Sequence, residues 1–355
     1  MSSSGKRALV VVAVLVLIAA AVGYYFLRGH PSPPLAVAPG PPPDLLSLLP
    51  PGAPVVAFGD VAALRNSPFA ADLTSFGPAP DQEEEYREFV RETGFDYSRD
   101  LDKFAVDAWP DTGKTLPNGA ARIALIVLAE GRFDRAKISA YSRRIGSVSK
   151  HGDIDVYDVP SSMPGETISL AFLSDNRIAL AQETSIDPVL PPAKSGGLDA
   201  PTRERLAHVS GATVFAVAKT ENLPKLLGNS QFQSGQLNRL LKSIREISLA
   251  AHPDGNKLTV AAEADCDSMS NALQLSAALD ALRWIGRAAL ADPKTRAQMT
   301  REDAANLDTL LKVATVSHED HFLRIRLELT PAMLRTVSAP PPPPRPAPIK
   351  VAGHS

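Results

Sequence analysis

The densest group of chemically capable side chains is the run His318-Glu319-Asp320-His321. Imidazole and carboxylate groups are ligands that zinc and other divalent metals prefer. The flanking residues have the apolar pattern of strands, which places the run at a hairpin turn. A solvated turn is the simpler interpretation. If a metal binds this chain, we expect His318 and His321 to be among its ligands, with others from distant parts of the sequence.

The run Thr112-Gly113-Lys114-Thr115 matches the end of a phosphate-binding loop. The full motif requires a glycine five positions before Gly113, where Ala108 stands, and a helix after the last threonine. Residues 116–119 (Leu-Pro-Asn-Gly) predict a turn instead. We therefore exclude a phosphate loop here.

Two carboxylate pairs have strand spacing, Asp100 with Asp102 and Asp153 with Asp155. Acid–base catalysis needs two carboxylates in different environments across a cleft. Nothing in the sequence indicates such a cleft, so we expect both pairs at solvated strand edges. The sequence also lacks the nucleophile elbow, dinucleotide, paired-cysteine zinc and metalloprotease motifs. No catalytic or cofactor-binding residue is predicted.

Cys266 is the single cysteine, so the chain forms no internal disulfide. Its neighbours Asp265 and Asp267 disfavour the thiolate form. We expect a structural thiol at the end of a strand.

Residues 8–26 form an uncharged apolar run of the length that an α-helix needs to cross a bilayer. Two interpretations compete: a retained signal anchor, and a signal peptide cleaved near Ala21 and Gly23. Tyr24, Tyr25 and Phe26 continue the apolar run, which favours the anchor. Lys6 and Arg7 then keep residues 1–7 in the cytoplasm, and the rest of the chain is exported.

Composition limits the partners of the exported part. The net charge of −2 does not favour nucleic acid, and a hydrophobic fraction of 44% suffices for a core. Residues 27–52 are rich in proline and predict a semi-rigid linker, with a short helical turn from Asp44 to Leu49. Residues 339–355 form a second proline-rich segment, which we expect to be a disordered tail. The alternative is a polyproline helix that docks in an aromatic groove of a partner.

The pattern of elements predicts an α+β fold made of two similar modules, residues 53–190 and 211–338, joined by a loop over 191–210. Each module opens with Gly-Ala and an apolar strand, 55–59 in the first and 214–218 in the second, and Asp60 can cap a short helix after the first of these strands. In each, a later strand leads to a helix capped by aspartate, Asp134 or Asp267, and then to a hairpin. The hairpin strands are 168–173 and 177–181, joined by a turn at 174–176, in the first module, and 313–316 and 322–329 in the second. Hairpins predict largely antiparallel sheets, with helices on one face.

The helix predicted over residues 268–290 is strongly apolar. Leu273, Ala277, Trp284 and Ile285 lie near one side, and Leu275, Leu279 and Leu282 widen the apolar surface. We expect this broad surface to be core packed on the second sheet. Asp280, Arg283 and Arg287 then supply a polar stripe for water. The alternative is a helix that binds a partner.

The layout of an apolar anchor, a proline linker and the segment LLPPGAPVVAFGDVAAL (48–64) resembles a group of membrane-anchored exported bacterial proteins with duplicated α+β modules and no known function. The resemblance implies a place in the cell envelope and transfers no catalytic residue.

Together these features predict a single-span membrane protein, inserted in the cytoplasmic membrane, whose extracytoplasmic part binds an envelope protein or surface component without catalysis. The alternatives are an exported hydrolase or metal-dependent enzyme with a site assembled from distant residues, and a carrier of a small ligand or lipid.

Overall fold

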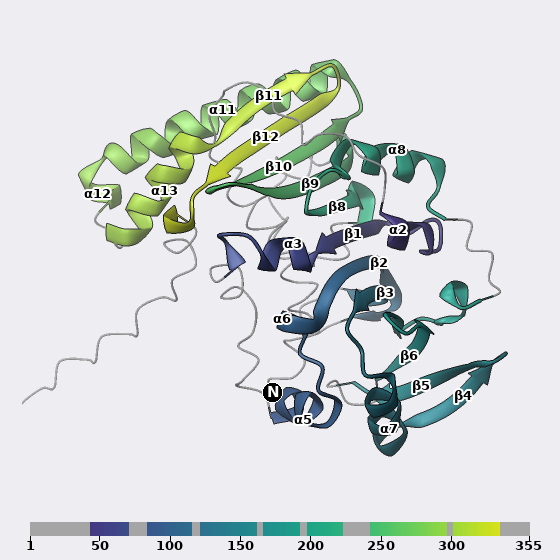
Figure 1. The fold of residues 1–355 in the computed structure, drawn as a ribbon. Helices are drawn as coiled ribbons and strands as arrows, with labels where there is room; N and C mark the ends of the chain where they lie inside the picture. The colour runs from purple at the N-terminus through teal and green to yellow at the C-terminus, as the bar shows by residue number, and fades with distance from the viewer. Residues whose placement is uncertain are drawn as a thin grey trace, which may run out of the picture.

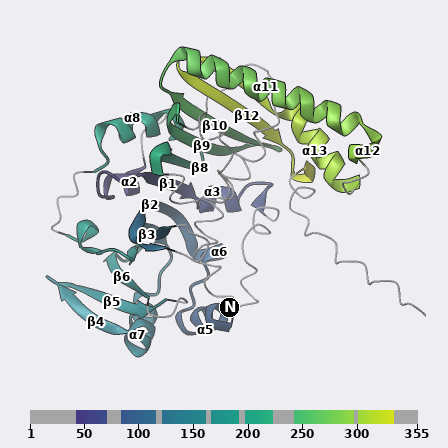
Figure 2. The ribbon, with the colours of Figure 1, turned by 180° about the vertical axis from the view of Figure 1, so that it is seen from behind.

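The computed structural model describes residues 43–70, 84–115, 121–161, 166–191, 197–222, 242–296 and 301–333. They form an α+β fold with one large antiparallel sheet and several helices (Figures 1 and 2). The predicted anchor, most of the proline linker and the tail 339–355 lie outside this part. Within the described ranges, no helix is both long enough and apolar enough to span a bilayer.

All twelve strands of the described chain belong to this one sheet, in the order β11-β12-β10-β9-β8-β1-β2-β3-β7-β6-β5-β4. Every neighbouring pair is antiparallel. The strands are β1 (Val55–Asp60), β2 (Leu101–Thr115), β3 (Ala121–Gly131), β4 (Ser147–His151), β5 (Ile154–Pro160), β6 (Thr167–Ser174), β7 (Arg177–Gln182), β8 (Val214–Lys219), β9 (Ile244–Asp254), β10 (Lys257–Cys266), β11 (Thr315–Glu319) and β12 (Phe322–Leu329).

The two halves of the chain meet in the middle of the sheet, where β1 pairs with β8. The pair is symmetric about its centre, Ala57 opposite Ala216. One end is closed by Asp60 N donating to Thr213 O and the other by Lys219 N donating to Pro54 O, both at 2.8 Å. The sequence left open whether the halves form one sheet or two, and the structure has one.

The helices lie on both faces of the sheet. The described helical segments are α2 (Asp44–Ser47), α3 (Val61–Arg65), α5 (Glu84–Thr93), α6 (Tyr97–Asp100), α7 (Arg135–Ile145), η3 (Asp187–Val189), α8 (Ala200–Val209), η4 (Thr220–Asn222), α11 (Met269–Ala291), α12 (Pro293–Arg296) and α13 (Arg301–Val313). Side chains of α2 and α8 pack with Val56, Phe58 and Phe215 on one face. The strand residues that α7 and α11 contact belong to the opposite face, because strand residues alternate in direction.

Several local predictions are confirmed. Asp60 caps α3 by accepting from Ala63 N at 2.8 Å, and Asp134 caps α7 by accepting from Lys137 N at 3.1 Å. The two predicted hairpins are present as β6–β7 and β11–β12. The physical signals here are local, a cap residue or a turn between apolar runs.

Two expected boundaries differ from the structure. The folded part does not begin at residue 53, because Leu45, Leu46 and Leu49, assigned to the linker, are fully buried against the sheet. The expected loop 191–210 contains α8, which Asp199 caps by accepting from Thr202 N. Pro201 stands in the first turn of α8, where a missing N–H costs nothing.

Two further corrections concern single elements. The cap of α11 is Ser268, whose hydroxyl accepts from Asn271 N at 3.2 Å, rather than Asp267. Val313, expected in a strand, ends helix α13. Strands β2, β4 and β9 and helix α13 were not predicted.

Asp107 is the reason β2 does not look like a buried strand. It lies between Val56 of β1 and Ile126 of β3, its side chain is 0% exposed, and neither carboxylate oxygen has a hydrogen-bond partner among the described residues. Burial raises the pKa of Asp107 to about 8. The carboxyl group is therefore protonated in the folded chain at neutral pH.

We predict that Asp107→Asn stabilises the fold and removes part of its pH dependence. The folded chain keeps a proton that the unfolded chain releases between an ordinary aspartate pKa of about 3.9 and about 8. The free energy of unfolding should therefore fall as pH rises through that window and level off above it. At pH 7.5 the free energy of unfolding of the variant should exceed that of the wild type by on the order of a few kcal/mol.

The measurement is denaturant unfolding of the wild type and the variant from pH 5 to 9. Asp153→Asn, at an exposed turn position, is the control and should leave the slope unchanged. If the free energy of unfolding of Asp107→Asn depends on pH as that of the wild type does, Asp107 is not protonated in the folded chain.

Candidate interaction surface

Helix α11 covers the second half of the sheet. It begins directly after β10 and lies across β10, β12 and β11 (Figure 2). Half of its buried positions carry small side chains, Ala272, Ser276 and Gly286, and the other half carry Leu275, Arg283 and Leu290. Leu275 joins the core between the helix and the strands, and Leu279 packs against that core.

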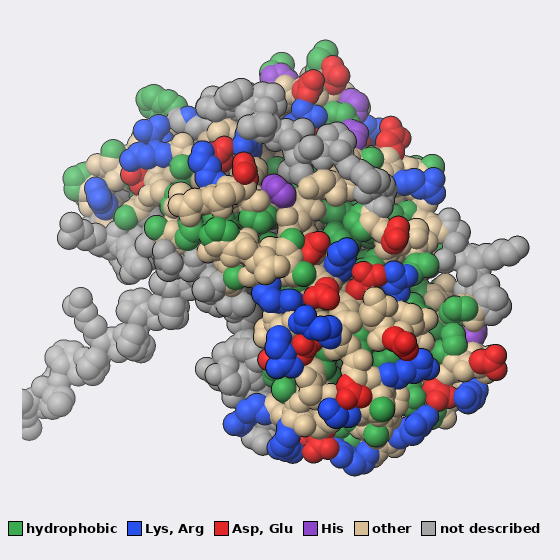
Figure 3. Space-filling model, viewed as in Figure 1, with side chains coloured by type: hydrophobic (Ala, Val, Ile, Leu, Met, Phe, Trp, Pro, Cys, Tyr) green, Lys and Arg blue, Asp and Glu red, His purple; other side chains and the backbone are tan. Residues whose placement is uncertain are grey.

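The outer side of α11 is apolar. Eight large hydrophobic side chains are exposed in the described chain, and Tyr97, Ile145 and Val148 are the three that lie elsewhere. The five on α11 are Met269 (62% exposed), Leu273 (51%), Leu282 (38%), Trp284 (72%) and Ile285 (62%). In Figure 3 hydrophobic side chains protrude along the upper left edge, where α11 runs in Figure 1. Such a concentration is typical of an interaction site, whereas scattered apolar residues are normal on any surface.

This orientation corrects the sequence expectation for the helix. Leu273, Trp284 and Ile285 were expected to pack on the sheet, and they face away from it. Arg283, expected in a polar stripe facing water, is only 5% exposed. The helix is therefore rotated so that its largest apolar side chains are outside. We name its exposed positions from Met269 to Ala288 the outer face of α11.

Arg283 is poorly satisfied in its buried position. Its Nη1 lies 3.6 Å from Oδ1 of Asp280, and neither Nε nor Nη1 has a hydrogen-bond partner within the described chain. Burial lowers the pKa of Arg283 to about 10, and burial also raises the pKa of Asp280. A charged group held this way costs stability. Packing of the inner side alone therefore does not account for the orientation of α11.

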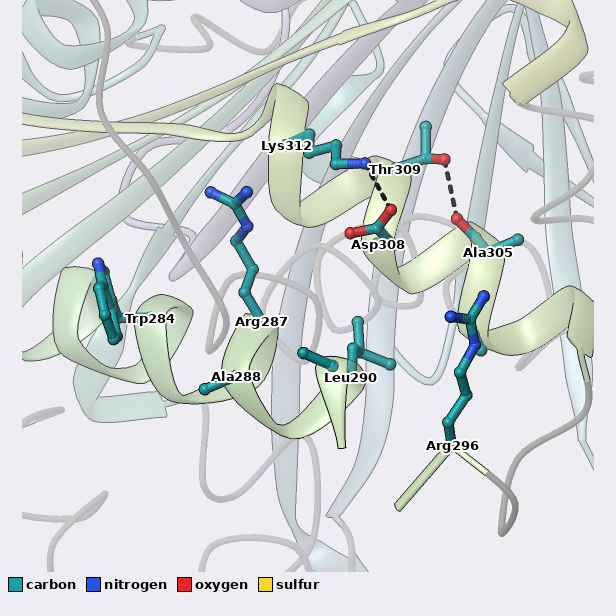
Figure 4. Close-up of a pocket in the computed structure, with 11 residues that line it drawn as sticks. Trp284, Arg287, Ala288, Leu290, Arg296, Ala305, Asp308, Thr309 and Lys312 are labelled. Atoms are coloured by element: carbon teal, nitrogen blue, oxygen red, sulfur yellow. Dashed lines mark hydrogen bonds and ion pairs between the residues drawn. The ribbon is translucent and has the colours of Figure 1, made fainter. Parts of the chain in front are cut away.

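A groove of about 710 Å³ separates the C-terminal part of α11 from α12 and α13 (Figure 4). Trp284 and Leu290 line it on the α11 side. Its cations are Arg287, Arg296 and Lys312, and Lys312 pairs with Asp308 at 2.6 Å. The groove continues the outer face of α11 toward a basic end.

The predicted metal ligands lie at a hairpin turn, as expected. His318 and Glu319 end β11, and Asp320 adopts a positive φ of 51° in the turn. Glu319 pairs with Arg324, while Nε2 of His321 lies 3.7 Å from Oδ1 of Asp265. No group of three or more potential ligands is gathered anywhere in the described ranges. The structure thus adds no further ligand to His318 and His321, and the metal site stays a prediction.

The other sequence candidates are structural. Gly113 lies within β2, which runs on to Thr115, so the phosphate-loop match is a strand. Cys266 ends β10 and is fully buried, and burial together with Asp265 and Asp267 raises its thiol pKa to about 11. The prediction that Cys266 lies at the end of a strand is confirmed.

The carboxylate pairs are neutralised by basic side chains. Asp100 is buried rather than solvated, and its hydrogen bonds with Arg99 are the main cause that lowers its pKa to about 2. Asp102 lies 3.5 Å from Arg65, and Asp155 pairs with Arg143 at 2.8 Å.

Comparison with known proteins adds little to this description. No family model matches the chain, and no curated protein matches it. Solved structures that are similar include crystal forms III, I and IV of TP0453, with TM-scores of 0.46, 0.42 and 0.44. They are 11–12% identical, and the alignments cover 83% of this chain and 97–98% of those chains. At these values the likeness assigns neither a family nor a function.

We predict that Arg283→Met increases the free energy of unfolding by about 1 kcal/mol, because a buried charge with incomplete hydrogen bonding is replaced by an apolar side chain of similar length. Arg287→Met, at an exposed position one turn further on, is the matched control and should change it by less than about 0.5 kcal/mol. Thermal or denaturant unfolding measures both. A loss of more than 1 kcal/mol in Arg283→Met means that Arg283 has partners that stabilise the fold, and contradicts the assignment.

Proposed function

We propose that this chain is a single-span protein of the cytoplasmic membrane, anchored by residues 8–26, whose extracytoplasmic domain is a non-enzymatic binding module of the cell envelope. The outer face of α11 is its docking surface. The observation that carries the proposal is the exposure of Trp284 and Ile285 beside the burial of Arg283. A helix with no external contact gains by the opposite rotation, with its indole inside and its guanidinium in water.

The anchor limits where partners are met. Between residue 26 and the first described residue, Pro43, lie 16 residues rich in proline. An extended proline-rich chain spans about 3 Å per residue, so the domain stays within about 50 Å of the membrane surface. The docking surface therefore serves partners that lie at or near the membrane.

We also infer that the domain arose by internal duplication. From the central pair outward, β1-β2-β3-β7-β6 in the first half matches β8-β9-β10-β12-β11 in the second. In each half a helix follows the third strand, α7 after β3 and α11 after β10. The first half adds β4 and β5 beyond β6, whereas the second adds α12 and α13. The proposed docking surface thus lies on the helix that corresponds to α7 of the first half.

We predict that a photo-reactive amino acid at position 285 of the full-length chain gives discrete cross-linked adducts in intact cells. Trp284→Asp should abolish these adducts, because a charge in the centre of an apolar contact must be desolvated. The control position is Arg143, an exposed residue of α7 on the same face of the sheet. It should give no discrete adduct.

Two results contradict the proposal. Equal yields of cross-linked adducts at positions 285 and 143 contradict a docking surface on α11. A specific turnover catalysed by the purified protein removes the non-enzymatic assignment.

A further inference from the structure

The outer face of α11 is self-complementary about its own midpoint. Its central stripe is Leu273, Ala277, Ala281 and Ile285, spaced by four residues. When the helix is laid antiparallel on a copy of itself, with the two-fold axis at residue 279, Leu273 faces Ile285 and Ala277 faces Ala281. Large residues thus stand at both ends and small ones at the centre. This arrangement lets two helices approach closely, with the ends filled.

We propose that a second copy of this chain occupies the outer face of α11, in an antiparallel α11–α11 pair related by a two-fold axis. The proposal rests on the docking function given above and names the partner. A two-fold interface uses the same patch on both copies and must therefore be complementary to itself. The flanking positions follow the same register: Gln274 faces Trp284, and Ser270 faces Ala288. The indole N–H of Trp284 is a donor and the side-chain oxygen of Gln274 an acceptor, so the pair is chemically matched.

Charge favours a copy over other occupants. The central stripe of α11 carries no charge; the nearest charges are Arg287, at the C-terminal end of the outer face, and the partly buried Asp280, 3.6 Å from Arg283. Two copies therefore meet without repulsion, whereas a charged partner finds no complementary group on this stripe. A helix that lies on a lipid surface carries Lys and Arg along its polar face. The side of α11 opposite the stripe is packed on the sheet, and the groove cations cluster at its C-terminal end only.

The size of the stripe sets the strength of the pair. α11 has 23 residues and is about 35 Å long. The paired positions from Ser270 to Ala288 span about 27 Å, and at about 10 Å width on each copy they bury about 540 Å² in total, which is below the roughly 1,000 Å² of a stable interface. The dimer is therefore weak in dilute solution. Anchoring two copies in one membrane raises their effective concentration and favours the pair.

Single cysteines in the full-length, membrane-bound chain test the register. Native Cys266 is fully buried and stays in place. In the antiparallel pair, Ala281 lies about 6 Å along the axis from its image, whereas Ala288 lies about 27 Å from its own. A short bifunctional maleimide should cross-link Ala281→Cys to itself and should not cross-link Ala288→Cys or Ser270→Cys alone. A mixture of Ser270→Cys and Ala288→Cys chains, one chain of each, should cross-link again.

Ile285→Asp added to Ala281→Cys should cause loss of the cross-linked dimer. Ile145→Asp, at an exposed isoleucine of α7, is the matched control and should leave the dimer unchanged. Cross-linking of Ala288→Cys to itself indicates parallel helices and overturns the proposal. Absence of a cross-linked dimer both for Ala281→Cys and for the mixture of Ser270→Cys and Ala288→Cys also overturns it. If the photo-adducts at position 285 persist in that case, the docking function stands with another occupant, a different protein or lipid; if they are also missing, both proposals fail.

Discussion

The antiparallel pairing of β1 with β8 is the interaction on which the rest of the structure depends. It joins two strands that are far apart in the sequence. Next to its central pair, Phe58 lies opposite Phe215, and their rings stack with 5.3 Å between the ring centroids. Because both strands are interior, their buried residues can be apolar on both faces. By the alternation of strand residues, α7 and α11 pack on the same face of the sheet, one in each half.

Given that frame, the side chains on the inner side of α11 decide what the surface looks like. Ala272 and Leu275 pack in the core that β10, β11 and β12 form. Five large apolar residues of the same helix are exposed, and Arg283 is buried with its Nε and Nη1 unpaired within the described chain. A rotation that costs free energy in the isolated domain is understandable when the outer face is covered in the working protein. The docking surface that we propose rests on this imbalance.

Much of the fold could be predicted from the sequence where the signal is local. Caps such as Asp134 and turns such as 174–176 depend on a few adjacent residues, and the structure has them. β2 was not predicted because Asp107 interrupts an apolar run, and a buried aspartate is intelligible only once β1 and β3 flank it. The orientation of α11 was predicted wrongly because apolar residues surround most of the helix. Periodicity then cannot choose the inner side, and the small residues that do choose it give a weak hydrophobic signal.

Oxidative footprinting of the full-length chain tests the central claim, that the outer face of α11 is covered in the membrane-bound protein. Modification of Trp284 and Met269 would be compared between intact cells and detergent-purified monomer, with partly buried Trp109 as the internal reference. The account predicts that both side chains are modified readily in the monomer and protected in cells, while Trp109 reacts equally in both. Equal modification of Trp284 in cells and monomer would contradict it, because the face would then be open to water where the protein works.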